Sequence, residues 1–252
     1  MIPVERRNKI VELVENKDVM SLPELADVLG VSMITIRRDL KEIIKKGLLQ
    51  PVFGGVKAVS RLSEEPHRDY YEKRAIPQKE AISLKALPFI NKNACIYLDA
   101  GTTTFALAEK ICQRDDLTVI TNDFGIINLL IRKSNCKLIH TGGTVNRENM
   151  ACAGESTAMA LEKLSIDVAF ISSTSWDLRG ITSSSEAKIA VKRALVKSSR
   201  RRILLCDSLK FGTVATYLAL PLEEFDTVIT DTGLSKDAAV AVHEKGVELI
   251  LA

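Results

Sequence analysis

Three polar segments in the second half of the chain contain residue types that suit the binding of an anion. The first, Asp99-Ala100-Gly101-Thr102-Thr103-Thr104, follows an apolar run and leads into an expected helix. A glycine there lets the backbone approach a ligand closely, and the threonine hydroxyls, free N–H groups and helix dipole favour a negative charge, phosphate above all. The second and third segments are Thr121-Asn122 and Thr141-Gly142-Gly143. We therefore expect these loops to form an anion-binding site.

Charged side chains at two further places would add to this site. The segment Asp207-Ser208-Leu209-Lys210-Phe211-Gly212 brings Lys210 to the end of another apolar run, and Glu186 and Lys188 stand at another expected helix start. Each feature alone has a plainer explanation, since a Gly-Thr-Thr turn is an ordinary helix cap, Asp207 can cap its own loop and Lys210 can be solvated. Their occurrence at successive expected strand ends favours a common anion site. The chain has neither a Walker A sequence nor a Gly-x-Gly-x-x-Gly pattern, so nucleotide binding is not favoured.

The elements that would position these residues alternate along the chain. Continuously apolar runs alternate with helical patterns, which is typical of a mostly parallel, doubly wound α/β sheet. The expected strands are 94–98, 117–120, 136–140, 168–172, 202–206, 225–230 and 247–251, and the expected helices are 78–90, 103–112, 124–132, 155–164, 186–198 and 235–245. Ligands bind beyond the carboxyl ends of the strands in such a sheet, which is where the polar segments lie.

A second kind of chemistry is indicated near the start of the chain, where residues 22–41 have the pattern of a helix-turn-helix. Ser21 and Glu24 form a capping box, and Pro23 is tolerated in the first helical turn. Gly30 can adopt the left-handed conformation that ends a helix, and Ser32 can cap the next one. Leu25, Val28 and Leu29 are expected to form the apolar side of the first helix, and Ile36, Leu40, Ile43 and Ile44 that of the second.

The opposite face of the second helix carries side chains that suit the major groove of DNA. It holds Ile34, Thr35, Arg38, Lys41 and Lys45, with Arg37 on its flank. Arginine can pair with guanine or grip phosphate, and a methyl-bearing side chain can contact the thymine methyl group. The alternative is a solvated amphipathic helix with an ordinary charged face. The predicted DNA-contacting set is Ser32, Ile34, Thr35, Arg37, Arg38, Lys41 and Lys57.

Residues 48–57 follow this helix and have the pattern of a hairpin, with Gly54-Gly55 expected as its tight turn. A hairpin after the recognition helix makes a winged helix-turn-helix. The segment Thr35-Ile36-Arg37-Arg38-Asp39-Leu40, followed by a Gly-Gly wing, resembles the DeoR family of bacterial transcriptional regulators. That family often has a basic or histidine residue just before the wing glycines, where this chain has Pro51-Val52-Phe53. Lys57 or Arg61 would then have to make the phosphate contacts of the wing.

The resemblance extends over nearly the whole chain, because Asp-x-Gly-Thr-Thr, Thr-Asn, Gly-Gly and Asp-x-x-Lys-Phe-Gly occur in the family's order. It implies a sensor domain with a fold related to ribose-5-phosphate isomerase and an effector that is a phosphorylated sugar or a derivative. The residues that the resemblance places around the effector are Asp99, Gly101, Thr102, Thr103, Thr121, Asn122, Gly143, Glu186 and Lys210. Trp176 and Arg179 either help to select the ligand or are structural.

Length and composition set the remaining expectations. A chain of 252 residues suits two unequal domains, and we expect a DNA-binding domain at 1–58, a linker at 59–80 and an effector-binding α/β domain at 81–252. The net charge is only +3, so the DNA prediction depends on where the charges lie. No apolar run has membrane-spanning length and the start lacks a signal-peptide layout, which predicts a cytoplasmic protein.

The cysteines and histidines do not predict a metal centre or a catalytic triad. The five cysteines, Cys95, Cys112, Cys136, Cys152 and Cys206, have no metal-ligand spacing, and Cys95, Cys136 and Cys206 are expected as small buried hydrophobic residues. The three histidines are scattered. No cofactor, metal or catalytic residue is therefore predicted.

The sequence predicts a homo-oligomeric regulator, with a repressor preferred to an activator, that binds double-stranded operator DNA and a phosphorylated sugar or sugar-acid effector. The alternative is a sugar-phosphate isomerase-like enzyme that carries a DNA-binding domain, in which Asp99, Glu186 and Lys188 would do acid–base work.

Overall fold

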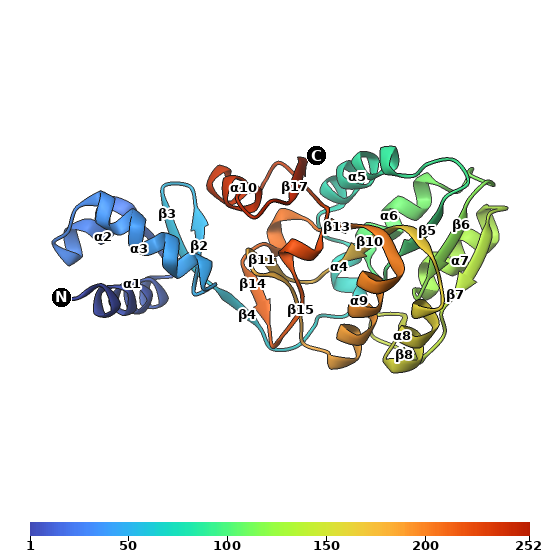
Figure 1. Cartoon of the computed structure of the whole chain (residues 1–252), viewed down its shortest axis with the longest axis horizontal. Coiled ribbons are helices and arrows are strands. Elements are labelled where there is room, and N and C mark those ends of the chain that lie inside the picture. The colour runs from blue at the N-terminus through green and yellow to red at the C-terminus, as the bar shows by residue number, and fades with distance from the viewer.

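The computed structural model describes residues 1–252. Figure 1 shows a small N-terminal domain at one end of an elongated molecule and a larger α/β domain at the other, joined through the strand β4 (Ser60–Leu62). Both termini lie inside the view, with the C-terminus on the larger domain. No helix combines the length and apolar character needed to cross a bilayer.

The N-terminal domain has the predicted winged helix-turn-helix architecture. Its helices are α1 (Pro3–Lys17), α2 (Leu22–Leu29) and α3 (Met33–Lys45), and its strands β1 (Val19–Ser21), β2 (Leu49–Val52) and β3 (Gly55–Ala58) form an antiparallel sheet in the order β1-β3-β2. Ser21 and Glu24 make the expected capping box, Gly30 is left-handed, and the Ser32 hydroxyl accepts from the N–H of Thr35 at 3.2 Å. Helix α1 was not predicted.

The core of this domain is apolar side chains from all three helices and the sheet. Leu25, Ile36, Leu40 and Ile43 are buried as predicted, and Ile44 packs against them half-buried. Val28 was expected on the apolar side of α2 but is 57% exposed. The reason is that α1 and α3 cover only the side of α2 that carries Leu25 and Ala26.

The hairpin turn lies one residue earlier than predicted. Gly55 belongs to β3 and pairs with Val52 and Ser21, so the two turn residues are Phe53 and Gly54. Gly54 has a φ of +72°, which glycine adopts at little cost. The N–H of Leu22 donates to the Gly54 carbonyl at 3.2 Å, which fixes the turn against the start of α2. Phe53 therefore projects from the tip of the wing, 93% exposed.

The segment between the domains is ordered by contacts with the larger domain. It contains β4, α4 (Arg68–Glu72) and the start of α5 (Ile76–Ala86), which runs into the short 3-10 helix η1 (Leu87–Phe89). Strand β4 pairs in parallel with β14 (Thr213–Ala215), far away in the sequence. The predicted boundaries of the linker, 59 and 80, stay a prediction.

The larger domain is built on the predicted doubly wound sheet, and all strand pairs of this seven-stranded sheet are parallel. The seven strands lie in the order β17-β16-β13-β10-β5-β6-β7. Their bounds are β5 (Cys95–Leu98), β6 (Thr118–Thr121), β7 (Lys137–His140), β10 (Ile166–Ser172), β13 (Ser199–Leu205), β16 (Thr227–Thr230) and β17 (Glu248–Leu251). The chain builds outward from β5 to β7 and then returns to place β10 beside β5, so the strand order reverses between β5 and β10.

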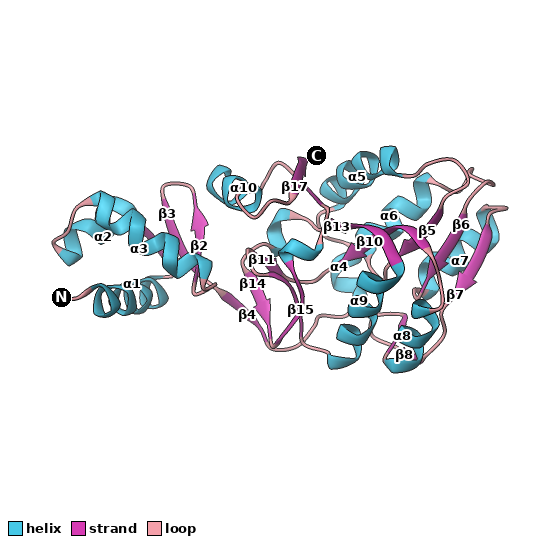
Figure 2. Ribbon diagram, in the orientation of Figure 1, coloured by secondary structure: helices cyan, strands magenta, loops and turns pink.

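Helices cover both faces of this sheet (Figure 2). One face packs against α5, α6 (Thr102–Lys110) and α7 (Phe124–Lys133), through residues such as Ile82, Leu107 and Leu130. The other packs against α8 (Glu155–Glu162), α9 (Glu186–Ser198) and α10 (Lys236–His243), through residues such as Leu161 and Leu195. Each predicted helix and strand of this domain is present, with ends that differ by up to four residues.

Short strands that were not predicted lie around the carboxyl edge of the main sheet. Strands β11 (Trp176–Asp177), β12 (Gly180–Ser183) and β15 (Tyr217–Pro221) form one antiparallel sheet, and β8 (Thr144–Asn146) pairs with β9 (Ala151–Ala153). Two 3-10 helices complete the domain, η2 (Ser208–Lys210) and η3 (Leu222–Glu224).

Candidate functional site

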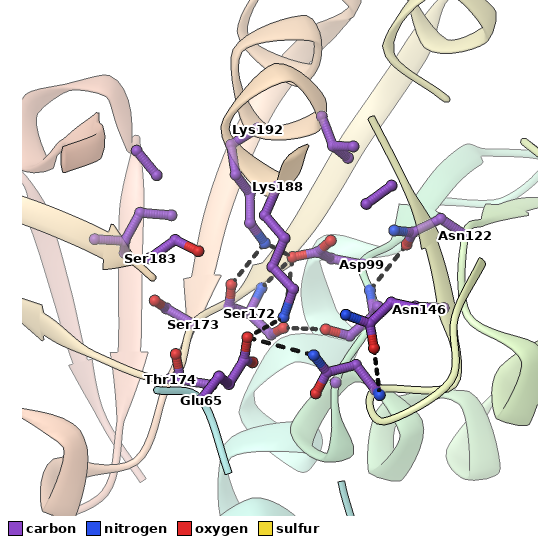
Figure 3. A pocket seen from close by; sticks show the side chains of 18 of the residues that line it. Glu65, Asp99, Asn122, Asn146, Ser172, Ser173, Thr174, Ser183, Lys188 and Lys192 are labelled. Carbon is purple, nitrogen blue, oxygen red and sulfur yellow. Dashed lines mark hydrogen bonds and ion pairs between the residues drawn. The ribbon is translucent and has the colours of Figure 1, made fainter. Parts of the chain in front are cut away.

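The main pocket lies where the strand order of the sheet reverses, beyond the carboxyl ends of β5 and β10. This is the place at which doubly wound sheets bind ligands. It encloses about 880 Å³ of empty space, part of it open to solvent. Figure 3 shows side chains from the end of β5, the end of β10, helix α9 and the linker pointing toward one another in it. Predicted site residues that line it are Asp99, Gly101, Thr102, Thr103, Asn122, Lys188 and Lys210.

Asp99 and Asn122 form the rigid floor of the pocket. The Asp99 carboxylate accepts from the backbone N–H of Ser172 at 3.0 Å and is paired with Lys192. The amide oxygen of Asn122 accepts from the N–H of Ala100 at 3.0 Å and from the Tyr97 hydroxyl at 2.8 Å. Burial raises the pKa of the Tyr97 phenol well above its usual value, so the hydroxyl stays a donor. These bonds join neighbouring strand ends and fix the position of each polar group.

Helix α9 contributes two lysines to one wall. Lys188 and Lys192 are four residues apart, so both project from the same face of the helix (Figure 3). Lys188 pairs with Glu65 of the linker, and Lys192 also donates to the Ser172 carbonyl at 2.8 Å. Lys192 was not predicted, although the helical spacing from Lys188 would have indicated it.

Lys210 closes the opposite wall, between this pocket and a second cavity beside α4. Its ammonium lies 3.2 Å from the Asp207 carboxylate and 4.9 Å from the ring centre of Tyr71. Burial alone would lower the pKa of Lys210, but the Asp207 carboxylate beside it raises that pKa above the ordinary value. Lys210 therefore remains a cation at neutral pH.

The linker supplies a further part of the pocket that sequence reasoning missed. Glu65, Arg68 and Tyr71 all line it. The Arg68 side chain is buried and pairs with Asp123, which in turn accepts from the N–H of Gly101 at 3.2 Å. The linker thus contacts the backbone of the first predicted anion-binding loop through one intermediate side chain. No local motif marked these residues, because their role depends on where the linker folds back.

Four predicted effector residues do not line the pocket. Thr121 is buried and donates to the Leu98 carbonyl at 2.7 Å, and the Gly142 carbonyl accepts from Thr157 at 2.7 Å. Gly143 packs on Thr157, and Glu186 is exposed at the start of α9. Asp99, Glu186 and Lys188 are therefore not gathered as the acid–base set of the enzyme alternative. The effector-binding roles of the remaining residues stay predictions.

Trp176 and Arg179 belong to the structural framework and do not line the pocket. Trp176 is fully buried, donates its indole N–H to the Asp207 carbonyl at 3.3 Å and makes an edge contact with Phe211. Arg179 pairs with Asp177 at 2.7 Å. Of the cysteines expected as buried hydrophobic residues, Cys136 and Cys206 are buried and Cys95 is half-buried. No cluster of three metal-ligating side chains occurs.

The predicted DNA-contacting residues lie on the outer side of α3. Ile34 is 80% exposed, and Arg37, Arg38 and Lys41 are exposed beside it. The hydroxyls of Ser32 and Thr35 are 3.0 Å apart at the start of the helix. Lys57 lies on β3, 3.8 Å from Asp18. The outer side of α3 therefore carries cations and one exposed apolar side chain, and the contact of these residues with DNA stays a prediction.

The two domains touch through the wing. The Ser235 hydroxyl, next to α10, donates to the Pro51 carbonyl at 3.5 Å, and beside the wing Lys41 of α3 lies 3.8 Å from Glu244. The N–H of Ser60 donates to the Gly212 carbonyl at 3.2 Å. A Cβ atom at position 212 would overlap the Gln50 side chain, so the wing packs tightly on this loop. Gly212 is two residues from Lys210, which places the wing close to the pocket wall.

Solved structures with a similar fold are distant. Ribose-5-phosphate isomerase A from Neisseria gonorrhoeae is 14% identical, with a TM-score of 0.39 over 53% of this chain and 52% of that chain. RipA from Yersinia pestis is 17% identical, with a TM-score of 0.44 over 66% of this chain and 45% of that chain. At such TM-scores the likeness is too low to support any conclusion about function.

Sequence relatives cover nearly the whole chain. The uncharacterized HTH-type transcriptional regulator YgbI of Escherichia coli strain K12 is 48% identical, over 100% of this chain and 99% of its own length. The HTH-type transcriptional regulator GlpR of Haloferax volcanii is 31% identical, over 99% of this chain and 98% of its own. A putative aga operon transcriptional repressor of Escherichia coli O157:H7 is 26% identical, over 98% and 93%.

Both domains match family models. Residues 6–61 match the DeoR-like helix-turn-helix domain, and residues 74–232 match the DeoR C terminal sensor domain. These matches agree with the winged helix-turn-helix and the doubly wound sheet described above. The chain belongs to the DeoR family of transcriptional regulators.

Proposed function

We propose that this regulator is a homo-oligomeric repressor of a carbohydrate or sugar-acid catabolic operon, released from its operator by a phosphorylated sugar or sugar-acid effector. The observation that carries the proposal is the convergence of Arg68, Lys188, Lys192 and Lys210 on one pocket that adjoins the wing. Cations beside polar hydroxyls and amides suit a ligand with a phosphate at one end and hydroxyl groups along its length.

The DNA side of the proposal depends on α3. Its exposed arginines and Ile34 would enter the major groove, and pairing of two subunits would space the half-sites by about one helical turn or a multiple. Lys41 would contact DNA only after its ion pair with Glu244 breaks. Both side chains are exposed, so this ion pair is weak in water.

The coupling between the two sites would run through contacts of the linker and the wing. Lys210 faces the pocket, and Gly212 holds both Ser60 and Gln50 at the base of the wing. A ligand that moves this loop changes the position of the wing. A coupling free energy of about 1–3 kcal/mol would change operator affinity about 5- to 150-fold.

Titration of the full chain into labelled DNA from upstream of its own and neighbouring genes tests the proposal. Fixed salt and excess nonspecific DNA are required, because phosphate contacts make affinity steeply salt-dependent. We expect a specific protein–DNA complex that one compound of a sugar-phosphate panel dissociates. A specific complex that no member alters would remove the effector proposal. No specific complex with any of these fragments would count against the operator proposal, and turnover of a pentose phosphate would favour an enzyme.

Removal of the Lys210 charge should weaken the response to the effector without weakening operator binding. Since Lys210 also neutralises the buried Asp207, the variant should combine Lys210→Met with Asp207→Asn and be compared with Asp207→Asn alone. We expect the effector concentration needed for half release to rise about tenfold, the scale of one charge-assisted contact. Lys92→Met, at an exposed position, is the control. An unchanged dose–response would remove Lys210 from the effector site.

Phe53 is expected to contact DNA from the wing tip, in place of the basic residue common in the family. Apolar side chains insert into the minor groove in several architectural proteins. Burial of a phenylalanine contributes about 1.5–3 kcal/mol, so Phe53→Ser should lower operator affinity roughly 10- to 150-fold. At 93% exposure, the change should leave the thermal midpoint of the free protein unaltered. Equal affinity of the variant and the wild type in a gel-shift titration would contradict this role.

A further inference from the structure

Each cation of the effector pocket has a carboxylate partner within the chain. Lys188 pairs with Glu65, Lys192 with Asp99, Lys210 with Asp207 and Arg68 with Asp123. An anionic ligand therefore meets no free positive charge when it enters. To gain a charge-assisted contact, its anionic group must replace one of the four carboxylates.

Three of these carboxylates are fixed in the protein interior. The side chains of Asp99, Asp123 and Asp207 are 3%, 0% and 3% exposed. Asp99 accepts from the N–H of Ser172, and Asp123 accepts from the N–H groups of Gly101 and Ile126. Displacing a buried carboxylate from such partners leaves it without hydrogen bonds in a low-dielectric site, which is costly.

Glu65 is more exposed than these three carboxylates, and it lacks the backbone hydrogen bonds that Asp99 and Asp123 accept. It lies in the loop between β4 and α4, its side chain is 12% exposed, and its only hydrogen-bond partners are the side chains of Lys188 and Asn149. Figure 3 shows its carboxylate reaching from the linker toward the tip of Lys188. Glu65 can leave the pocket for water by a movement of its own loop, with no loss of a backbone hydrogen bond.

We infer that Glu65 is an internal competitor of the effector, whose carboxylate holds the place on Lys188 that the effector's anionic group takes in the bound state. The inference rests on the proposed effector site and names the residue that sets its selectivity for anions. A neutral sugar offers Lys188 no replacement charge, so it leaves the Glu65 pair intact. A phosphate or carboxylate of the ligand does replace it.

Departure of Glu65 also frees the part of the linker that follows β4. Glu65 is three residues beyond Leu62, where β4 ends, and β4 follows β3 of the wing after a single residue. The pair between Lys188 and Glu65, together with the pairing of β4 with β14, therefore holds the chain that leads into the DNA-binding domain. When the effector's anionic group replaces Glu65 on Lys188, this chain loses the ion pair and becomes free to move.

Inorganic phosphate binding to the full chain, measured by calorimetry at constant ionic strength, tests the inference. Glu65→Gln should bind phosphate about tenfold more tightly than the wild type, and Glu65→Ala should show the same gain. Glu64→Gln removes the same charge from the neighbouring exposed position and should change the affinity less than about twofold. Adding Lys188→Gln to Glu65→Gln should abolish the gain.

Trypsin cleavage after Arg61 gives a second readout, because this exposed residue lies in the linker. Glu65→Gln without phosphate and the wild type with phosphate should both be cut faster than the wild type alone. Equal phosphate affinity of the wild type and Glu65→Gln would overturn the inference. So would a gain in phosphate affinity that persists when Lys188 is also replaced, or an unchanged rate of trypsin cleavage in Glu65→Gln.

Operator titrations separate this inference from the proposed function. If Glu65→Gln binds phosphate more tightly but the protein binds no specific operator, the role of Glu65 as a competitor stands and the repressor function is rejected. If sugar phosphates release the wild type and Glu65→Gln from the operator equally well, and both bind phosphate with equal affinity, the repressor function stands. The role of Glu65 as a competitor is then rejected.

Discussion

Arg38→Ala is expected to lower specific operator affinity strongly while leaving the protein folded. Arg38 is exposed on the outer side of α3 and has no ion-pair partner within the chain, so its guanidinium is available to a guanine edge or a phosphate. A bidentate base contact contributes about 1–3 kcal/mol of discrimination. A protein that occupies two half-sites loses this contact twice, so operator affinity should fall roughly 30- to 10⁴-fold.

Competition with nonspecific DNA at fixed salt is the measurement that reveals this loss. The matched control is Arg132→Ala on α7, another exposed arginine that lies on the sensor domain. Affinity for nonspecific DNA should fall much less than affinity for the operator, because one of several phosphate contacts is removed. Normal operator affinity in Arg38→Ala, with the same salt dependence as the wild type, would refute the placement of α3 in the groove.

The sequence predicted the sheet and the helix-turn-helix well because their signals are local. Ser21, Glu24, Gly30 and Ser32 act on the backbone within a few residues, and continuous apolar strands between helices identify a parallel sheet wherever they occur. The wing turn was misplaced for a reason outside the hairpin. Gly55 is needed where β3 passes the carbonyl of Met20, so of the two glycines only Gly54 lies in the turn.

The site was predicted only in part, and the missing half came from long-range folding. Loops at strand ends, such as that of Asp99, could be placed from the order of the strands. Glu65 reaches Lys188 over 123 residues of chain, and Arg68 reaches Asp123 over 55, so no spacing rule connects them. Gly142 and Glu186 have suitable chemistry, but the fold directs them away from the pocket.

Asp39→Ala should destabilise the winged helix-turn-helix severely, although Asp39 is next to Arg38 in the sequence. Asp39 is 3% exposed and accepts from the guanidinium of Arg6 on α1 at 2.5 Å, with Arg7 at 3.6 Å. Removal of the carboxylate leaves the buried Arg6 charge without a partner. Such a loss costs about 3–5 kcal/mol of stability. We expect this cost to appear in the unfolding of α1 and α3, because the pair joins these two helices.

Amide hydrogen exchange in α3 measures this loss without relying on a single transition for both domains. Protection should fall in Asp39→Ala and be kept in Asp27→Ala, where an exposed aspartate on α2 is removed. The double variant Arg6→Met with Asp39→Leu should recover most of the protection, since apolar residues often replace a buried ion pair at little cost. It should also regain operator binding, because neither side chain faces the groove. Recovery of protection without operator binding would show that Asp39 positions the arginines before it, beyond its contribution to stability.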